Sequence, residues 1–245
     1  MRKRESSLWS ASSVIIDRVT PFALSVMRPE MLYPLFGLEA KTNLPPSRLP
    51  IPTEQYWLKW FRELTEIHAS IGRLNDAEAY VGQYPAIRTF RLHGISEASW
   101  IRYHLEMYLQ EEYILCNRLR RFLTSVKRAA TRAAEPGKAK VAAGLLTETA
   151  NGFGPVIQHR ASHVHVARMW DKDLRDLDLF ILLCKGSSEK RRVFIFLRKL
   201  QAEFVKTSWR DRLRQNNKAI REHCTRIFKV VVPILIACEP KTASK

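Results

Sequence analysis

Apolar side chains recur at every third or fourth position over long stretches of this chain, which is the spacing of one face of an α-helix. The longest such stripe consists of Ile101, Leu105, Tyr108, Leu115, Leu119, Phe122 and Val126. Glycines that would serve tight hairpin turns are few, only 9 in 245 residues. The pattern therefore predicts an all-α fold, a helical bundle of about five to seven helices.

Capping residues, glycines and prolines mark where the helices should begin and end. Thr53 is a predicted N-cap for a helix to about Asn75, and Ser96-Glu-Ala-Ser99 offers a cap for a long helix to about Arg132. Pro136-Gly137 predicts a turn before a helix over about 138–150. The segment Asn151-Gly-Phe-Gly-Pro155 predicts a break between helices.

Two more helices are expected in the last third of the chain. Asp171 should cap a helix that runs through Leu183. Residues 189–238 predict one long helix or a bent pair, which Pro233 bends or ends. Its expected inner face is Phe196, Leu200, Phe204, Leu213, Ile220, Cys224, Phe228 and Val231.

The chain divides into three expected regions by composition. Residues 1–52 contain seven prolines and many serines, which predicts a partly ordered N-terminal arm. Residues 53–238 form the predicted helical bundle, and residues 239–245 a flexible tail. Within the bundle, His68 lies at the edge of an apolar stripe and is interpreted as a packed structural histidine.

Glu112 interrupts the apolar stripe of the long helix over 101–126. A carboxylate on a buried seam is costly unless it is paired. Either the helix is rotated so that Glu112 is half exposed, or Glu112 meets a basic group inside the protein. The first alternative is favoured, because an unpaired buried glutamate is rare.

The chain carries a formal net charge of +17, which predicts attraction to polyanions such as RNA. The charge is concentrated in two segments. Residues 118–140 have eight Lys/Arg against one acid, and residues 185–229 have fourteen against four. The candidate RNA-binding residues are Arg118, Arg120, Arg121, Lys127, Arg128, Arg198 and Lys199. A merely solvated basic face is the plain alternative.

The four cysteines are far apart and include no CxxC pair, which indicates neither a zinc knuckle nor a disulfide framework. No apolar run is long and uninterrupted enough to span a bilayer. We therefore expect a cytoplasmic protein with no membrane partner. No Walker loop, GxGxxG or GxSxG motif is present, so no cofactor is expected.

Three of the seven histidines lie in His159-Arg160-Ala161-Ser162-His163-Val164-His165. As zinc ligands, the histidines lack a carboxylate or further partner, and Arg160 would repel the cation. As a nucleophile, Ser162 lacks a third group to orient a base. We therefore predict neither a metal site nor a serine nucleophile here.

Arg160 and His165, with four residues between them, fit the R-x4-6-H motif of the HEPN superfamily, and the chain resembles that superfamily over roughly residues 55–230. The helix of sequence Ile101-Arg-Tyr-His-Leu-Glu-Met-Tyr-Leu-Gln-Glu-Glu-Tyr113 and the start Asp171-Lys-Asp-Leu174 also resemble uncharacterised bacterial members. Ala161 stands where active members commonly have a polar residue.

The resemblance implies a helical homodimer that cleaves RNA without metal, as part of a toxin–antitoxin or antiviral system with a possible antitoxin partner. His165 would then take a proton from a ribose 2′-hydroxyl and Arg160 would hold the phosphate, with His163 as a helper. The alternative function is a non-catalytic RNA- or protein-binding bundle. A DNA-binding regulator is a weaker third option, since no helix-turn-helix is evident.

Overall fold

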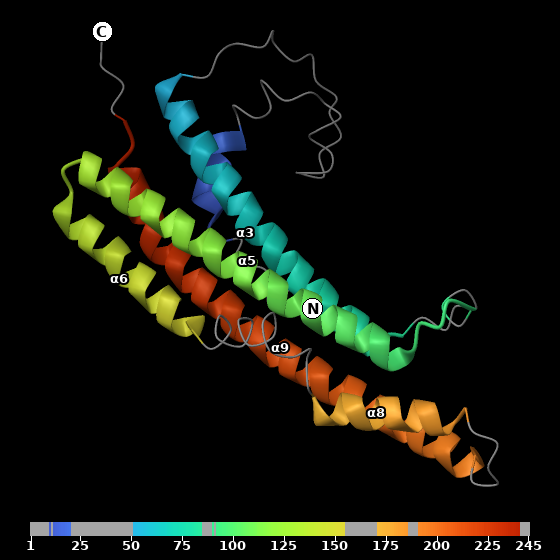
Figure 1. The fold of residues 1–245 in the computed structure, drawn as a ribbon. Helices are drawn as coiled ribbons and strands as arrows, with labels where there is room; N and C mark the ends of the chain where they lie inside the picture. The colour runs from blue at the N-terminus through green and yellow to red at the C-terminus, as the bar shows by residue number, and fades with distance from the viewer. Residues whose placement is uncertain are drawn as a thin grey trace, which may run out of the picture. The chain divides into compact units, whose positions relative to one another are not determined.

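The computed structural model describes residues 10, 12–20, 51–84, 90, 92–154, 171–185 and 191–240. Over these residues the chain is helical and contains no β-strand (Figure 1). The helices are α3 (Pro52–Gly82), α5 (Glu97–Arg132), α6 (Pro136–Gly152), α8 (Lys172–Leu183) and α9 (Arg191–Ala237). The predicted all-α helical bundle is therefore confirmed.

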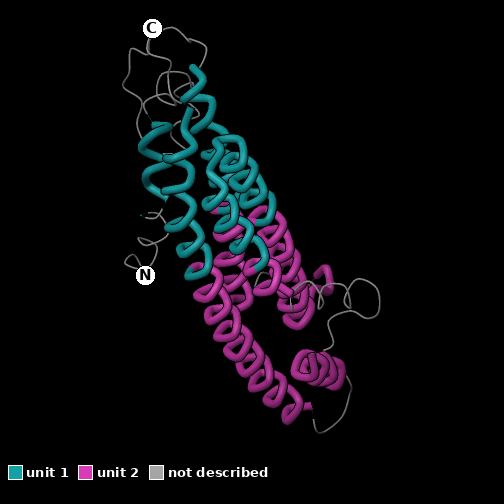
Figure 2. Tube along the Cα trace, turned by 90° about the vertical axis from the view of Figure 1, so that its left-hand side faces the viewer, with its two compact units in different colours: residues 1–67, 120–147, 222–245 teal, residues 68–119, 148–221 magenta. Residues whose placement is uncertain are grey.

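The chain forms two compact units, coloured separately in Figure 2. Unit 1 contains residues 1–67, 120–147 and 222–245, and unit 2 contains residues 68–119 and 148–221. Because α3, α5 and α9 are long, each contributes one part to unit 1 and another to unit 2.

Aromatic side chains form the core of unit 1. Trp60 from α3 packs edge-on against Phe122 from α5, with ring centroids 5.9 Å apart, and Phe122 packs against Phe228 from α9 at 5.6 Å. All three side chains are at most 1% exposed. Such pairs add about 0.5–1.5 kcal/mol each beyond the area that they bury.

A short helical stretch of the predicted N-terminal arm also belongs to unit 1. Residues 12–20 are helical, and Ile15 and Val19 are buried. Arg18 lies 3.6 Å from Glu239, and Trp57 donates its indole N–H to the same carboxylate at 2.7 Å. These contacts join the arm, α3 and the segment after α9 through one acidic side chain.

Unit 2 is held by caps and by polar contacts between helices. The Ser96 side chain accepts a hydrogen bond from the Ser99 amide at 3.1 Å, and Asp171 accepts one from Leu174 at 3.1 Å, so both predicted N-caps are confirmed. Gln201 of α9 donates to the Asp173 carbonyl of α8 at 3.1 Å.

Three helix boundaries differ from the sequence-based expectation. Helix α3 begins at Pro52, so the predicted N-cap Thr53 lies inside its first turn. Helix α3 continues past Asn75 to Gly82, because Ala77 and Val81 extend its buried face. Pro136 belongs to α6 itself instead of a turn before it, since proline fits the first turn of a helix. The reversal lies earlier, at Ala134, whose φ of 55° is in the left-handed region.

Pro233 does not end α9, which continues to Ala237. The predicted inner face of α9 is correct only in its second half, where Leu213, Ile220, Cys224, Phe228 and Val231 are buried. Phe196, Leu200 and Phe204 are instead 60%, 53% and 57% exposed. Ala202 and Val205 are the buried residues there. The prediction failed because the run from Val193 to Leu197 is apolar throughout, so spacing does not distinguish its two sides.

Candidate nucleic-acid interface

The predicted catalytic residues Arg160, His163 and His165 lie in residues 155–170, outside the described residues. The described chain reaches this segment from α6, which ends at Gly152, and leaves it at Asp171, the N-cap of α8. The helix break that the sequence predicts before the motif is therefore present on the α6 side. The role of the three residues remains a prediction.

Four cations are exposed on the part of α5 that belongs to unit 1: Arg120, Lys127, Arg128 and Arg132. We call these four residues the α5 cationic face. On an ideal helix Arg120 and Lys127 lie about 20° apart, Arg128 about 80° and Arg132 about 120° from Arg120, over about 18 Å of length. No acidic residue occurs in the sequence between Glu112 and Glu135. The part of α5 that carries this face therefore presents positive charge with no acid on the same stretch of helix.

Two other predicted RNA-binding arginines of α5 are engaged within the protein. Arg118 donates a hydrogen bond to Ser70 at 2.5 Å and lies 3.6 Å from Glu111, with only a quarter of its side chain exposed. Arg121 is exposed but forms an ion pair with Glu66 of α3. Both are therefore poorer phosphate ligands than the α5 cationic face.

The remaining two predicted RNA-binding residues lie on the first half of α9, in unit 2. Lys199 is exposed and Arg198 partly exposed. The structure therefore divides the predicted set between the units, with Arg120, Arg121, Lys127 and Arg128 in unit 1 and Arg118, Arg198 and Lys199 in unit 2.

Unit 2 contains a buried polar layer between α3, α5 and α9. The hydroxyl of Tyr108 donates to Asn217 at 2.8 Å and accepts from Asn216 at 3.0 Å. The Asn217 amide donates to the Leu74 carbonyl and to Glu78, both at 3.2 Å. Because each donor has an acceptor, the layer fixes how the three helices meet.

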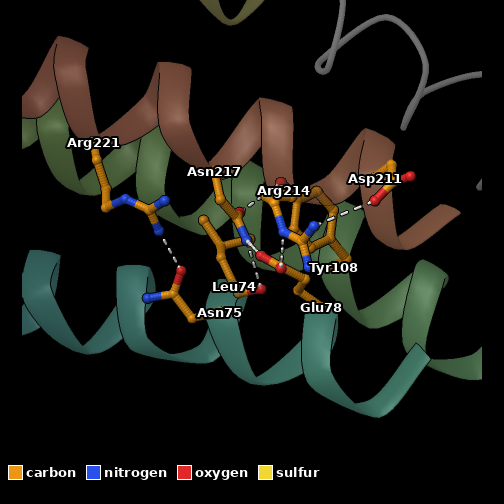
Figure 3. Close-up of polar contacts among 8 residues, drawn as sticks. All are labelled: Leu74, Asn75, Glu78, Tyr108, Asp211, Arg214, Asn217 and Arg221. Atoms are coloured by element: carbon orange, nitrogen blue, oxygen red, sulfur yellow. Dashed lines mark hydrogen bonds and ion pairs between the residues drawn. The ribbon is translucent and has the colours of Figure 1, made fainter. Parts of the chain in front are cut away.

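The edge of this layer carries charged groups that Figure 3 shows beside it. Arg214 of α9 donates to Glu78 of α3 at 3.1 Å and also contacts Asp211 at 3.4 Å. Arg221 donates to the side-chain oxygen of Asn75 at 2.6 Å. The Arg214–Glu78 and Arg221–Asn75 contacts link α3 to α9.

Glu112 is buried, with only 2% of its surface exposed, so the favoured expectation that it is half exposed is wrong. The alternative partner was a basic group, but the described hydrogen bond comes from the neutral amide of Asn216. Burial raises the pKa of Glu112 to about 7, although the hydrogen bond from Asn216 opposes the shift. The side chain thus changes its charge near neutral pH.

The adjacent Glu111 is also buried but has cationic partners. Arg73 donates to it at 2.9 Å, and Arg118 lies 3.6 Å away. Burial by itself raises the pKa of Glu111, but the hydrogen bonds and charges of these partners outweigh it and the pKa is lowered. The pKa values of two neighbouring carboxyl groups are therefore shifted in opposite directions, upward for Glu112 and downward for Glu111.

A small pocket opens beside Glu112, with a volume of about 260 Å³. Its lining residues are Leu105, Tyr108, Leu109, Glu112, Trp209, Arg212, Leu213 and Asn216. The Arg212 guanidinium lies 4.9 Å from the Trp209 ring centroid and 3.9 Å from Asp171. The buried indole N–H of Trp209 has no acceptor among the described residues.

The sequence interpretation did not identify Asn216, Asn217 or the pocket. One signal was available, since two consecutive asparagines in the middle of a long helix are poor helix formers and suggest side-chain hydrogen bonding. His68 is partly buried, and burial lowers its pKa to about 4, consistent with a packed histidine.

Within the described ranges, no group of three or more His, Cys, Asp or Glu side chains is arranged to hold a metal ion. The cysteines Cys116, Cys184, Cys224 and Cys238 are all free thiols, and burial raises the pKa of Cys224 to about 12. No helix in the described part of the chain is long and apolar enough to cross a bilayer.

No protein-family model, curated protein or solved structure matches this chain.

Proposed function

We propose that this protein binds RNA through the α5 cationic face and cleaves it without metal through Arg160 and His165. One observation supports the binding step most directly: Arg120, Lys127, Arg128 and Arg132 are exposed along about 18 Å of one helix. Phosphates of a nucleic-acid backbone release counterions when such a row of cations neutralises them. The net charge of +17 adds attraction at longer range.

The cleavage step rests on the sequence motif and on general phosphate chemistry. His165 removes the proton of a ribose 2′-hydroxyl, whose oxygen then forms a bond to the adjacent phosphorus. The bond from phosphorus to the 5′-oxygen breaks, and that oxygen needs a proton, which His163 supplies. Arg160 stabilises the charge on the phosphate oxygens by two parallel hydrogen bonds. No metal ion enters this sequence of events.

The resemblance to the HEPN superfamily further implies a homodimer and an antitoxin partner. In this arrangement two copies of the motif line a shared cleft. Sedimentation equilibrium of the purified chain measures the first of these expectations. A monomer at every concentration would remove the shared cleft from the proposal.

The binding step is tested with a fluorescent single-stranded RNA and a triple variant, Arg120→Ala/Lys127→Ala/Arg128→Ala. Each lost phosphate contact lowers the salt dependence of binding, so affinity at low salt should fall by at least about tenfold. The control removes three exposed cations elsewhere, Lys172→Ala/Lys185→Ala/Arg191→Ala. An equal loss in both variants would mean that net charge alone attracts the RNA.

The cleavage step is tested with purified protein in excess EDTA, beside Arg160→Ala and His165→Ala variants whose folding is checked by circular dichroism. Cleavage that persists in EDTA and disappears in both variants supports the ribonuclease. Salt-dependent binding of RNA that stays intact favours the alternative function, a non-catalytic binding bundle. Equal activity in all three samples indicates a contaminant and rejects this site.

A further inference from the structure

Four large apolar side chains are exposed along one stripe of the first half of α9. Val193, Phe196, Leu200 and Phe204 have 55%, 60%, 53% and 57% of their surface exposed. On an ideal helix they fall within about 80° of one another and extend over about 16 Å. Single exposed apolar residues are ordinary, but a continuous stripe marks an interaction surface. We call these four residues the α9 apolar stripe.

Cations line one border of the α9 apolar stripe. Arg192, Lys199 and Arg210 are all exposed, and an ideal helix places them about 40° to 60° beyond Phe196. On the other side, Gln201 contacts the Asp173 carbonyl of α8 at 3.1 Å. The stripe is therefore bordered by α8 on one side and by positive charge on the other.

One acid, Glu203, lies on the cationic border and is paired with a lysine. Glu203 accepts a hydrogen bond from Lys206 at 2.6 Å, and Lys206 also lies 2.8 Å from Glu97. Arg192, Lys199 and Arg210 outnumber this acid, so the border has a net positive charge. A partner surface that complements this part of α9 is apolar where it meets the stripe and negatively charged where it meets the cationic border.

We propose that the α9 apolar stripe docks the protein on an anionic lipid surface. A helix with phenylalanine and leucine on one face and basic residues at the border lies in the plane of a bilayer, with its apolar side at the boundary of headgroups and acyl chains. The aliphatic stems of Arg192 and Lys199 pack along the apolar layer while their charged ends reach the headgroups.

Charge decides between this occupant and a second copy of the chain. Two copies packed stripe to stripe with antiparallel α9 helices would bring their cationic borders together, whereas anionic headgroups complement the border. This proposal departs from the expectation of no membrane partner, which rested on the lack of a segment that could span a bilayer. A helix that lies on the membrane surface needs no such segment. The apolar part of the inference is separable from the proposed RNA binding, because none of the four residues of the α9 apolar stripe belongs to the α5 cationic face.

The test is flotation of the full chain with vesicles of phosphatidylcholine alone or mixed equally with phosphatidylglycerol. The wild-type protein should float with the mixed vesicles and much less with the neutral ones. The variant Phe196→Ser/Phe204→Ser should lower the partition coefficient by at least about tenfold. The matched control Ile51→Ser/Val141→Ser removes two apolar side chains that are 46% and 47% exposed elsewhere, and should float normally.

A charge variant, Arg192→Gln/Lys199→Gln, should also reduce flotation, and the difference from wild type should shrink at high salt. Failure of the wild-type protein to float with the mixed vesicles overturns the inference. So does equal flotation of Phe196→Ser/Phe204→Ser and wild type, since charge alone would then explain the binding. A dimer without lipid that this variant dissociates would assign the stripe to a second copy instead. RNA binding by Phe196→Ser/Phe204→Ser should be normal. A failure of the lipid proposal can therefore be distinguished from a failure of the proposed function.

Discussion

Asn216 of α9 donates a hydrogen bond to the buried carboxyl group of Glu112 on α5, so a neutral amide meets the acid that interrupts the apolar seam. A hydrogen bond from an amide only partly offsets the loss of hydration of a carboxylate. The balance leaves the pKa of Glu112 near 7, and this makes the contact between α5 and α9 in unit 2 sensitive to pH.

The first prediction concerns this pH sensitivity. Burial raises the folded-state pKa of Glu112 from 4.5 to about 7, so the folded protein holds a proton that the unfolded chain releases. Its contribution to the free energy of unfolding is fully present below about pH 4.5 and is lost as the pH rises through 7. The loss is on the order of 3 kcal/mol. Urea unfolding at pH 5 and pH 8 measures it.

Replacing the acid separates this effect from other titrating groups such as Glu63, whose pKa burial also raises. Glu112→Gln keeps an acceptor for Asn216 but cannot ionise, so its stability should change less between pH 5 and pH 8 than that of wild type. Glu106→Gln, an exposed change on the same helix, should leave the pH dependence as it is. Equal pH dependence in wild type and Glu112→Gln would contradict the assignment.

The second prediction concerns the Tyr108 hydroxyl. Tyr108→Phe removes the donor to Asn217 and the acceptor for Asn216, and leaves both amides partly unsatisfied. The free energy of unfolding should fall by about 1–3 kcal/mol, as measured by urea titration. Tyr103→Phe makes the same chemical change at a side chain that is 56% exposed, and should have almost no effect. Similar losses in both variants would argue against the polar layer.

The third prediction tests which side of α9 is buried. Phe228 is fully buried beside Phe122, so Phe228→Ala should reduce the free energy of unfolding by about 3–5 kcal/mol. Phe196 is 60% exposed, so Phe196→Ala should change it by less than about 0.5 kcal/mol. A large loss of stability in Phe196→Ala would mean that Phe196 lies on the buried face of α9, as the apolar spacing predicted.

The fourth prediction compares two cations of α5 as RNA contacts. Lys127 is exposed on the α5 cationic face, whereas Arg121 is paired with Glu66. Lys127→Ala should make the slope of log K against log salt shallower by about 1, the value of one phosphate contact. Arg121→Ala should change the slope by less. Fluorescence anisotropy with one RNA at several salt concentrations gives both slopes. The reverse order would mean that the Glu66 pair opens when RNA binds.

Local patterns predicted most helix ends because their causes are local. The caps at Ser96 and Asp171 depend on side chains within three residues of the amides that they accept from, so the sequence contains the whole interaction. The buried stripe from Ile101 to Val126 was also predicted correctly, because apolar residues recur there with the helical period. Of the predicted RNA-binding set, Arg120, Arg121, Lys127, Arg128 and Lys199 are exposed, and their role stays a prediction.

Tertiary structure decided what depends on partners distant in sequence. Whether Glu112 is exposed depends on Asn216, which lies on another helix, and no pattern within α5 contains that contact. In the same way, Arg118 is hydrogen-bonded to Ser70 and Arg121 is paired with Glu66, and both partners lie on another helix, α3. The exposed side of Phe196 follows from packing against α8, because a run that is apolar on both sides has no preferred face until a neighbour covers one. The sequence by itself determined an all-α, strongly basic protein, since the helical period and the charge are properties of the chain. The burial and pairing of each side chain were decided by the helices that pack around it.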